Sequence, residues 1–570
     1  SPLVERALHA LDRPSVGILE KIMRAPASWL RAGQVLTPNF MVANVLRDQF
    51  VTFIQSVVRF NPADIRRGFE AVRKETAAYQ EALSAGALGT EGVALDRVAA
   101  SEFLTKLSLD TGLTTRAWNV ARSPIELLRL GTRLSEESSR MGTFLRAREA
   151  GKGTREAAFL TREASLDFAR YGASMRGYNL ITAFFNAHVQ GLDRMGRAFA
   201  KDPAGTMFKS AMAITLPSTL LWFANQGNPA YENAQQWERD LFWFVPLPAT
   251  GVTVRIPKPF EYGMLFGSLW ERALDRVVKG DPEGMKGFVD SMVRMLAPEY
   301  TPTFARPLVE QFANRSTFTG NPLIPDRLLA ELPEYRYTEY TSETAKAVGR
   351  IVADLPAAGV IAASLAGAGL GYVKGGNVAG AIAGGLAGGL AGAAAVATDG
   401  FASPAVLENY VRGWSGGLGM YALQAADLGL RLAGVAPSFE QPAWTVKDIP
   451  IVRAFVVRYP SANAKPISDF YTAVAEVDRV KASMRARIRE GDMEAAERLA
   501  ERASRLPPPE TVDRIRAAIS RQGSLVHMIW RNPTILPAEK RQLIDGLYYA
   551  MIREAQEGNA IVKMQMEAMK

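Results

Sequence analysis

Histidine and cysteine, the side chains that most often carry nucleophilic, acid–base or metal chemistry, are scarce in this sequence. The chain has no cysteine, which leaves no thiolate nucleophile, no thiolate metal ligand and no disulfide. Its histidines stand far apart, without the spacing of a zinc site, and each is interpreted as a surface or hydrogen-bonded core residue: His9, His188 and His527. The sequence therefore predicts no catalytic residue, no metal site and no cofactor.

Two local patterns resemble catalytic loops, and neither fits its context. The segment GWSGG at 413–417 matches the G-x-S-x-G pattern of hydrolases, which requires a strand before it and a helix after it. Here the surrounding sequence is typical of a helix loosened by glycine. The segment GAGLGYVKGG at 367–376 resembles a phosphate-binding loop, but Lys374 is followed by glycine rather than Ser or Thr, and no strand precedes it. Glu137 lacks the downstream motifs of a lytic transglycosylase. We predict that the chain is not an enzyme.

The composition is that of a folded protein. Hydrophobic residues make up 48% and charged residues 22%, which excludes wholesale disorder. The net charge of +9 is spread along the chain, which fits a partner such as nucleic acid or anionic lipid as well as it fits an ordinary basic protein. The first residue is Ser1 rather than Met, which indicates a processed chain or a piece of a longer one.

Helix signals dominate the sequence. A capping side chain precedes proline at several positions, among them 61–62, 123–124, 281–282 and 403–404. The exception is 241–257, where aromatic and β-branched residues flank a Pro-Ala-Thr-Gly turn and predict a β-hairpin. The fold class expected is mainly α, an elongated multi-helical assembly with one short β-hairpin near 241–257 and a glycine-rich helical hairpin near 358–397.

Shifts in composition divide the chain into four expected regions. Residues 1–200 form an N-terminal helical region, and 201–350 a middle region with an apolar helix, the β-hairpin and a Pro/Tyr-rich connector. Residues 351–435 contain the glycine-zipper hairpin and a following helix, and 436–570 form a charged helical region. The uncharged stretch 210–231 is interpreted as a buried helix kinked at Pro217 rather than a bilayer span.

The charged C-terminal region contains expected helices before and after a break at 490–492, and another near 536–556. Basic and aromatic residues alternate over 531–553. This pattern fits contact with DNA or lipid phosphate, and a solvated helix face explains it equally well.

Glycine recurs every fourth residue over 376–392, in a segment where Lys374 is the only charged side chain between Asp354 and Asp399. Each such glycine costs about 1 kcal/mol in an exposed helix, so the spacing favours close contact between helix backbones. Three settings remain open for this hairpin: insertion into a membrane, a tightly packed subunit interface, or burial in a soluble core. The candidate packing residues are Gly367, Gly371, Gly376, Gly380, Gly384, Gly388 and Gly392.

Several ordered stretches resemble one family. They are TPNFMVANVLRDQF (37–50), FFNAHVQGLDRMGR (184–197), IPKPFEYGMLFGSLWERALD (256–275), NRSTFTGNPLIPDRL (314–328) running on to YTSETAKAVG (340–349), and SPAVLENYVRGWSGGLGMY (403–421). Together, over about residues 35–475, they resemble the large polyvalent protein-associated domain 38 of very long proteins from tailed bacteriophages and related mobile elements. The motif residues expected to have structural roles are Asn44, Arg47, Asp48, Asn186, Gln190, Asp193, Pro257, Pro259 and Glu271.

The resemblance implies an internal virion protein, also called an ejection protein. Such a protein lies inside the capsid before infection and in the periplasm or inner membrane of the host afterwards, where it helps genome DNA cross the envelope. The implied partners are copies of itself, other ejection or portal-associated proteins, the host inner membrane in a transient contact, and double-stranded genomic DNA. The alternatives are a non-catalytic scaffold segment of a larger virion RNA polymerase or peptidoglycan hydrolase, and a resident membrane pore protein.

Overall fold

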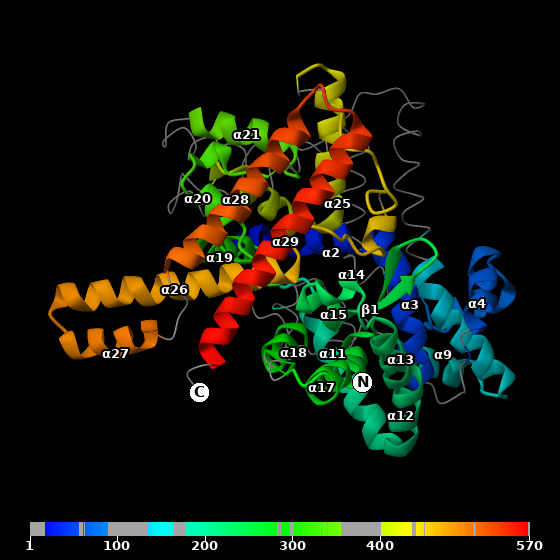
Figure 1. The fold of residues 1–570 in the computed structure, drawn as a ribbon. Helices are drawn as coiled ribbons and strands as arrows, with labels where there is room; N and C mark the ends of the chain where they lie inside the picture. Colours follow the sequence, from blue (N-terminus) through cyan, green and yellow to red (C-terminus); the bar gives the residue numbers. More distant parts are fainter. Residues whose placement is uncertain are drawn as a thin grey trace. The chain divides into compact units, whose positions relative to one another are not determined.

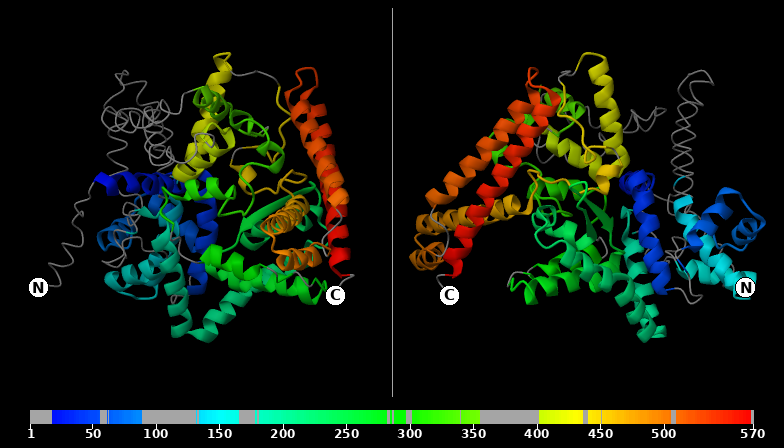
Figure 2. Two further views of the ribbon diagram at one scale, coloured as in Figure 1. Left: turned by 90° about the vertical axis from the view of Figure 1, so that its left-hand side faces the viewer. Right: turned by 45° about the vertical axis from the view of Figure 1, so that its right-hand side comes forward.

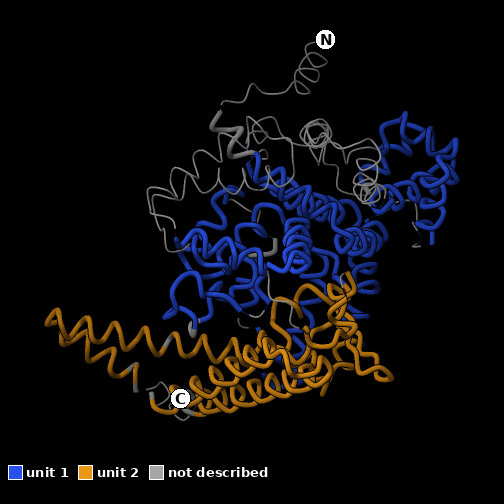
Figure 3. Tube along the Cα trace, turned by 90° about the horizontal axis from the view of Figure 1, so that it is seen from above, with its two compact units in different colours: residues 1–220, 257–436 blue, residues 221–256, 437–570 orange. Residues whose placement is uncertain are grey.

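The structure is a computed structural model whose described residues are mainly helical (Figure 1). The description covers residues 18–55, 61, 63–88, 131, 134–164, 178, 181–281, 284–285, 287–296, 301–338, 340–354, 401–435, 440–449, 451–504 and 509–567. The chain forms two compact units, and each is assembled from two separate stretches (Figure 3). Unit 1 draws on 1–220 and 257–436, and unit 2 on 221–256 and 437–570. The predicted glycine-rich hairpin and all seven of its candidate packing glycines lie outside the described residues.

Unit 1 is helical throughout its described part. Besides an unlabelled helix over 134–149, its elements are α2 (Ile18–Val35), α3 (Pro38–Gln55), α4 (Asp64–Arg73), α5 (Ala77–Ser84), α9 (Thr154–Ala164), α11 (Phe185–Lys201), α12 (Pro203–Ser210), the π-helix η2 (Ala211–Thr215), α13 (Leu216–Ala224, whose last turn belongs to unit 2), α16 (Phe260–Tyr262), the π-helix η3 (Gly263–Ser268), α17 (Leu269–Val277), α18 (Phe288–Leu296), α19 (Arg306–Ala313), α20 (Asp326–Leu329), the 3₁₀ turn η4 (Pro333–Tyr335), α21 (Glu343–Asp354) and α25 (Pro404–Leu432).

Helices α4, α5, α9 and 134–149 enclose one hydrophobic core of unit 1. Tyr79, Met141 and Phe144 are among its fully or nearly fully buried side chains. Two glycines let the backbones of α4 and helix 134–149 touch. A Cβ atom on Gly68 would lie 2.0 Å from the carbonyl oxygen of Ser138, and one on Gly142 would lie 2.7 Å from that of Asp64. Side chains larger than hydrogen are therefore excluded at this crossing.

Helix α25 confirms the interpretation of the 403–421 segment as a helix loosened by glycine. It begins at Pro404, and its regular geometry breaks at Gly416, which has φ 58° and ψ −148°. Helix α2 crosses α25 at this break, where a Cβ atom on Gly33 would lie 1.8 Å from the carbonyl oxygen of Ser415. Trp414 packs with Tyr410 and Phe401 in a second core of unit 1.

Unit 2 contains the predicted β-hairpin. Strands β1 (Phe242–Leu247) and β2 (Val252–Pro257) pair with each other, and β2 also forms an antiparallel bridge from Val254 to Val456. The short helices α14 (Pro229–Glu232) and α15 (Gln236–Leu241) precede this sheet.

Long helices make up the rest of unit 2: α26 (Lys465–Glu490), α27 (Met493–Ser504), α28 (Pro509–Arg531) and α29 (Pro537–Glu567). Helix α26 ends at Gly491 in the left-handed conformation with φ 78°, as the break predicted at 490–492 requires. Helices α28 and α29 lie side by side (Figures 1 and 2). With α26 they bury Phe470, Ile519, Ile544 and Tyr548. The charged C-terminal sequence therefore forms a helical assembly with an apolar core.

The uncharged stretch 210–231 differs in part from the prediction of a buried helix. Helices α12, η2 and α13 follow one another directly, and the π turn of η2 comes just before Pro217, where the helix must accommodate a missing N–H. However, Phe208, Met212, Leu216 and Leu220 are exposed, so the expectation of burial is wrong for this face. The reason is that small side chains on the opposite face pack against unit 1. Among the helices described, none combines the length and the apolar composition that crossing a membrane requires.

Candidate functional site

Several helical segments of unit 1 contribute charged and polar side chains to one buried cluster. They are α3, helix 134–149, α11 and the segment from Lys258 to α17. Arg194 of α11 donates from Nη2 to Oε1 of Gln55 on α3 at 2.5 Å. The amide nitrogen of Gln55 in turn donates to the hydroxyl oxygen of Tyr262 at 3.1 Å. These bonds join segments that are more than a hundred residues apart in the sequence.

Arg47 and Lys258 connect α3 to the next part of the cluster. The Nε of Arg47 donates to the carbonyl oxygen of Lys258 at 3.3 Å, and its guanidinium carbon lies 4.4 Å from the ring centre of Phe260. The Lys258 side chain is buried and its Nζ contacts Oε2 of the equally buried Glu271 at 2.9 Å. Because removal of either partner would leave an uncompensated buried charge, this ion pair specifies how the two segments meet.

The carboxyl groups at the centre of the cluster titrate near neutral pH. Burial raises the pKa of Asp48 to about 6, although Arg140, Arg194 and Arg47 oppose that shift. Burial also raises the pKa of Glu136 to about 7, and Asp48 and Glu137 add to the effect while Arg140 opposes it. Oε2 of Glu136 has no hydrogen-bond partner within the part of the chain that the structure describes.

The arginine side of the cluster is perturbed in the complementary direction. Burial lowers the pKa of Arg194 to about 10 and that of Arg47 to about 10. Glu137 accepts a hydrogen bond from the Tyr79 hydroxyl at 2.9 Å. The described residues contain no group of His, Cys, Asp and Glu side chains that is arranged to hold a metal ion. The geometry thus supports a polar core that holds helices together and contains one carboxyl group able to change charge near pH 7.

The cluster brings together several of the motif residues named from the sequence. Arg47, Asp48 and Glu271 lie within it, and Asn44 donates to Oδ2 of Asp48 at 3.4 Å. Pro257 ends β2 and Pro259 precedes α16, and both are buried.

The α11 motif residues have different environments. Gln190 is buried, whereas Asn186 is half-buried and Asp193 accepts from Nε of Arg197 at 3.0 Å on an exposed part of the helix. The sequence reasoning missed Arg194, although it lies in the quoted 184–197 motif. The available signal was its position four residues after Gln190, on the same face of the helix.

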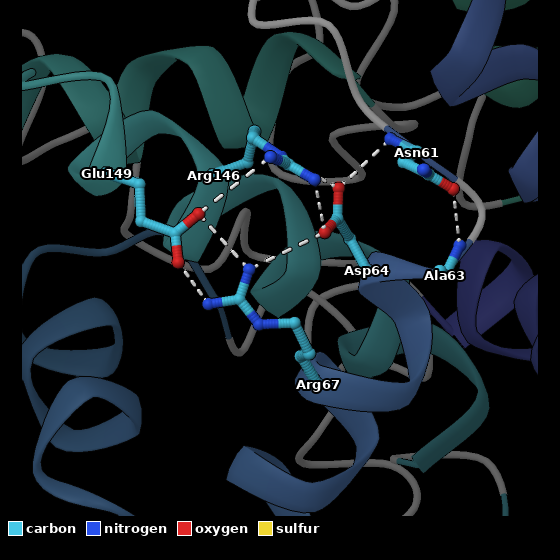
Figure 4. Close-up of polar contacts among 6 residues, drawn as sticks. All are labelled: Asn61, Ala63, Asp64, Arg67, Arg146 and Glu149. Carbon is cyan, nitrogen blue, oxygen red and sulfur yellow. Dashed lines mark hydrogen bonds and ion pairs between the residues drawn. The ribbon is translucent and has the colours of Figure 1, made fainter.

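A second charged network joins α4 to helix 134–149 (Figure 4). Arg146 donates to both carboxylate oxygens of Asp64, at 3.0 and 2.8 Å, and Arg67 pairs with Glu149. Weaker contacts at 3.6 Å (Arg67 to Asp64) and 3.9 Å (Arg146 to Glu149) close the ring. The backbone N–H of Asn61 also donates to Asp64 at 2.9 Å. This network surrounds the first turn of α4, where a carboxylate is favoured by the helix dipole.

The remaining sequence candidates have structural environments. Ser415 of the G-x-S-x-G pattern lies within α25 and donates to the carbonyl oxygen of Val411 at 2.5 Å, so the strand–turn–helix context of a nucleophile is missing at this site.

The basic stretch 531–553 is neither a solvated face throughout nor an open phosphate site. Lys540 is fully buried in unit 2, and its Nζ donates to the carbonyl oxygens of Glu440 and Trp530 at 2.7 and 3.1 Å. Arg541 donates to the carbonyl oxygen of Ala443 and to Asp448. Burial lowers the pKa of Lys540. Both cations therefore serve to fix the segment around 440–448 to α29.

These features define a mainly α-helical protein with charged clusters that join distant parts of the chain. Residues 228–452 match the family model of the large polyvalent protein associated domain 38, so this part of the chain belongs to that phage-associated domain family. The matched range includes the motifs at 256–275, 314–349 and 403–421, whereas those at 37–50 and 184–197 lie outside it. No curated protein and no solved structure matches the chain.

Proposed function

We propose that the chain is an internal virion protein of a bacteriophage, which is released from the capsid and assembles with copies of itself into a conduit for genome DNA. The observation that carries this proposal is the match of residues 228–452 to a phage-associated domain. The proposal places the protein inside the virion before infection and in the host envelope afterwards. It includes other ejection or portal-associated proteins and double-stranded DNA as partners.

The use of charge in unit 1 supports a structural role. Buried ion pairs such as Lys258–Glu271 and Arg146–Asp64 connect segments of the same unit, and in each pair the two side chains neutralise each other. Such pairs favour one arrangement of helices over others, which a protein that must assemble in a defined geometry requires. Large apolar side chains on the surface of unit 1, as on α12 and α13, also fit a protein that contacts partners.

The proposal assigns the transient membrane contact to the glycine-rich segment 375–395. The support is its sequence: no charged residue occurs in it, and its four-residue glycine spacing allows close helix contact. Flotation of the intact chain with liposomes tests this assignment. We expect Gly384→Glu with Gly388→Glu to reduce binding, and equal binding by both proteins would contradict it.

The virion itself provides the main test. Quantitative mass spectrometry would compare purified particles of the phage that encodes the chain with the same particles after triggered DNA release. We expect the chain in full particles and its depletion from emptied ones, with a capsid protein as the internal standard. Absence from full particles, or complete retention after release, would overturn the proposal. Recovery of these peptides only within a longer enzyme chain would favour the scaffold alternative instead.

A further inference from the structure

The rod formed by α12, η2 and α13 has its polar and apolar faces reversed. Four residues spaced by four are buried against unit 1 and are small or hydroxyl-bearing apart from one isoleucine: Thr206, Ser210, Ile214 and Ser218. Four large apolar residues with the same spacing face outward and are 45–67% exposed: Phe208, Met212, Leu216 and Leu220. We call these last four residues the outer ridge. A helix on the surface of a soluble protein ordinarily presents the opposite pattern.

The π-helix η2 keeps the outer ridge on one side of the rod. In a regular α-helix, residues four apart are about 40° past a full turn, so a row of four would drift by roughly 120° from first to last. A π-helix has more residues per turn. Because η2 covers Ala211–Thr215, in the middle of the row, it removes much of that drift. The exposure of all four side chains agrees with this account.

Hydrogen bonds on the inner face prevent the rod from turning to bury the outer ridge. Thr215 donates from its hydroxyl to the carbonyl oxygen of Phe266 at 2.8 Å. Trp270 donates from its indole nitrogen to the hydroxyl oxygen of Thr219 at 2.8 Å. A Cβ atom on Gly267 would lie 3.0 Å from Oγ of Ser218, which shows how closely η3 approaches. Rotation would break these bonds and place large side chains where only small ones fit.

We propose that the outer ridge pairs with the outer ridge of a second copy of this chain, with the two helices antiparallel. The row is symmetric about its midpoint, so a two-fold axis places Phe208 opposite Leu220 and Met212 opposite Leu216. Rows of residues four apart are the ridges that interlock in the commonest class of helix packing. The same surface therefore serves both partners.

The distribution of charge selects the antiparallel arrangement. No charged residue occurs from 210 to 231, whereas Lys209 lies next to the first residue of the ridge. In a parallel pair the two Lys209 side chains would face each other. In the antiparallel pair each Lys209 lies beside Thr219 of the other copy, which is uncharged. Like charges in direct opposition are destabilising, so the antiparallel pair avoids a repulsion that the parallel pair contains.

This pairing rests on the self-association in the proposed function and supplies its surface. One ridge is smaller than the roughly 800 Å² per partner of a stable protein interface, so we expect association that depends on concentration. A failure of the pairing leaves the virion test unaffected, and a chain that is absent from virions can still form the pair. The two outcomes are therefore distinguishable.

Sedimentation velocity of the full chain over a range of concentrations tests the surface. We expect Met212→Glu with Leu216→Glu to raise the dissociation constant of the self-association at least tenfold. Phe159→Glu is the matched control, because Phe159 lies on α9 and is 55% exposed. Circular dichroism would establish that all variants keep their helix content. Unchanged association in the double variant would overturn the proposal.

Cysteine pairs test the orientation, since the chain has no cysteine of its own. Met212→Cys and a size-tagged Leu216→Cys would be mixed and treated with a short bis-maleimide. We expect the mixed product to exceed either product of like with like, whereas a parallel pair would give the reverse. A chain that stays monomeric at all concentrations, yet floats with anionic vesicles and loses this binding on Met212→Glu, would also overturn the proposal and identify lipid as the occupant.

Discussion

Arg146 holds Asp64 through two parallel hydrogen bonds, from Nε to Oδ2 at 3.0 Å and from Nη2 to Oδ1 at 2.8 Å. Asp64 is only 2% exposed, and it begins α4, whereas Arg146 lies near the end of helix 134–149. The pair therefore sets the distance between two helices that are 82 residues apart at this point. Because the same carboxylate also accepts from the backbone of Asn61, it links the entry into α4 to the helix behind it.

We expect Arg146→Ala to destabilise α4 by about 2 kcal/mol, because the buried Asp64 carboxylate loses its bidentate partner while Arg67 and a backbone N–H remain. Hydrogen exchange of the α4 amides, followed by mass spectrometry, measures the effect. Glu149→Ala is the control within the same network. Its side chain is 47% exposed, so its removal should cost less than about 1 kcal/mol. Equal effects of the two substitutions would contradict this account.

Glu136 should make stability depend on pH. Burial raises its pKa in the folded state to about 7, above the ordinary value of 4.5, so the folded state binds the proton more tightly. The contribution of this residue to stability is therefore fully present below about pH 4.5 and is lost as the pH rises to about 7. We expect Glu136→Gln to stabilise the protein at pH 8, by up to about 3 kcal/mol.

Thermal melts at pH 5 and pH 8 measure the effect of Glu136→Gln. The gain should shrink toward pH 5, where the wild-type carboxyl group is already protonated. Glu156→Gln on α9 is the control, since this side chain is 51% exposed and its substitution should change little at either pH. A gain that is the same at both pH values would show that burial of the charge is not its cause.

The crossing of α2 and α25 should tolerate no side chain at Gly33. An added Cβ atom would lie 1.8 Å from the carbonyl oxygen of Ser415, so Gly33→Ala must push the helices apart and should cost 2 kcal/mol or more, as overpacking typically does (about 1–3 kcal/mol). Gly429 also lies in α25, but has nothing within 4 Å of an added Cβ atom. There the same change should stabilise the helix by about 1 kcal/mol. Urea unfolding of both variants gives the comparison, and two changes of the same sign would contradict it.

Asp427 should determine the stability of the first turn of α21. Its carboxylate accepts from the backbone N–H groups of Glu343 at 3.1 Å and Thr344 at 2.7 Å, although it lies on α25 rather than in the capping position itself. We expect Asp427→Ala to cost about 1–2 kcal/mol and to speed amide exchange at the start of α21, as loss of a helix cap does. Asp427→Asn retains one acceptor oxygen and should cost less. Faster exchange across all of unit 1 would instead indicate a general loss of packing.

Local signals in the sequence were enough to identify individual elements. The proline at 404 and the glycine at 491 mark the start of α25 and the end of α26, because each residue has a backbone preference that holds in any fold. The hairpin at 241–257 was predicted for the same reason, from its turn and its β-branched residues. The sequence motifs also pointed to Arg47, Asp48 and Glu271, which the structure brings into one cluster.

The partners of these residues could not be read from local signals. Glu136, Arg140 and Arg194 are ordinary charged residues in helical sequence, and the pKa of Glu136 changes only because other segments remove it from water. Likewise, the uncharged stretch from 210 was expected to be buried, since apolar residues usually are. The structure exposes one face of it because the hydroxyls of Thr215 and Thr219 bond to unit 1.

The sequence by itself determined the helical class, the hairpin, the helix ends and the near absence of histidine and cysteine chemistry, because these depend on residue type and on neighbours within a few positions. Only the tertiary structure decided which charges are paired, which glycines are at contacts and which apolar face is left outside. Those properties depend on segments far apart in the chain, and a change in burial alters the energy of a charged or apolar group more than any local preference does.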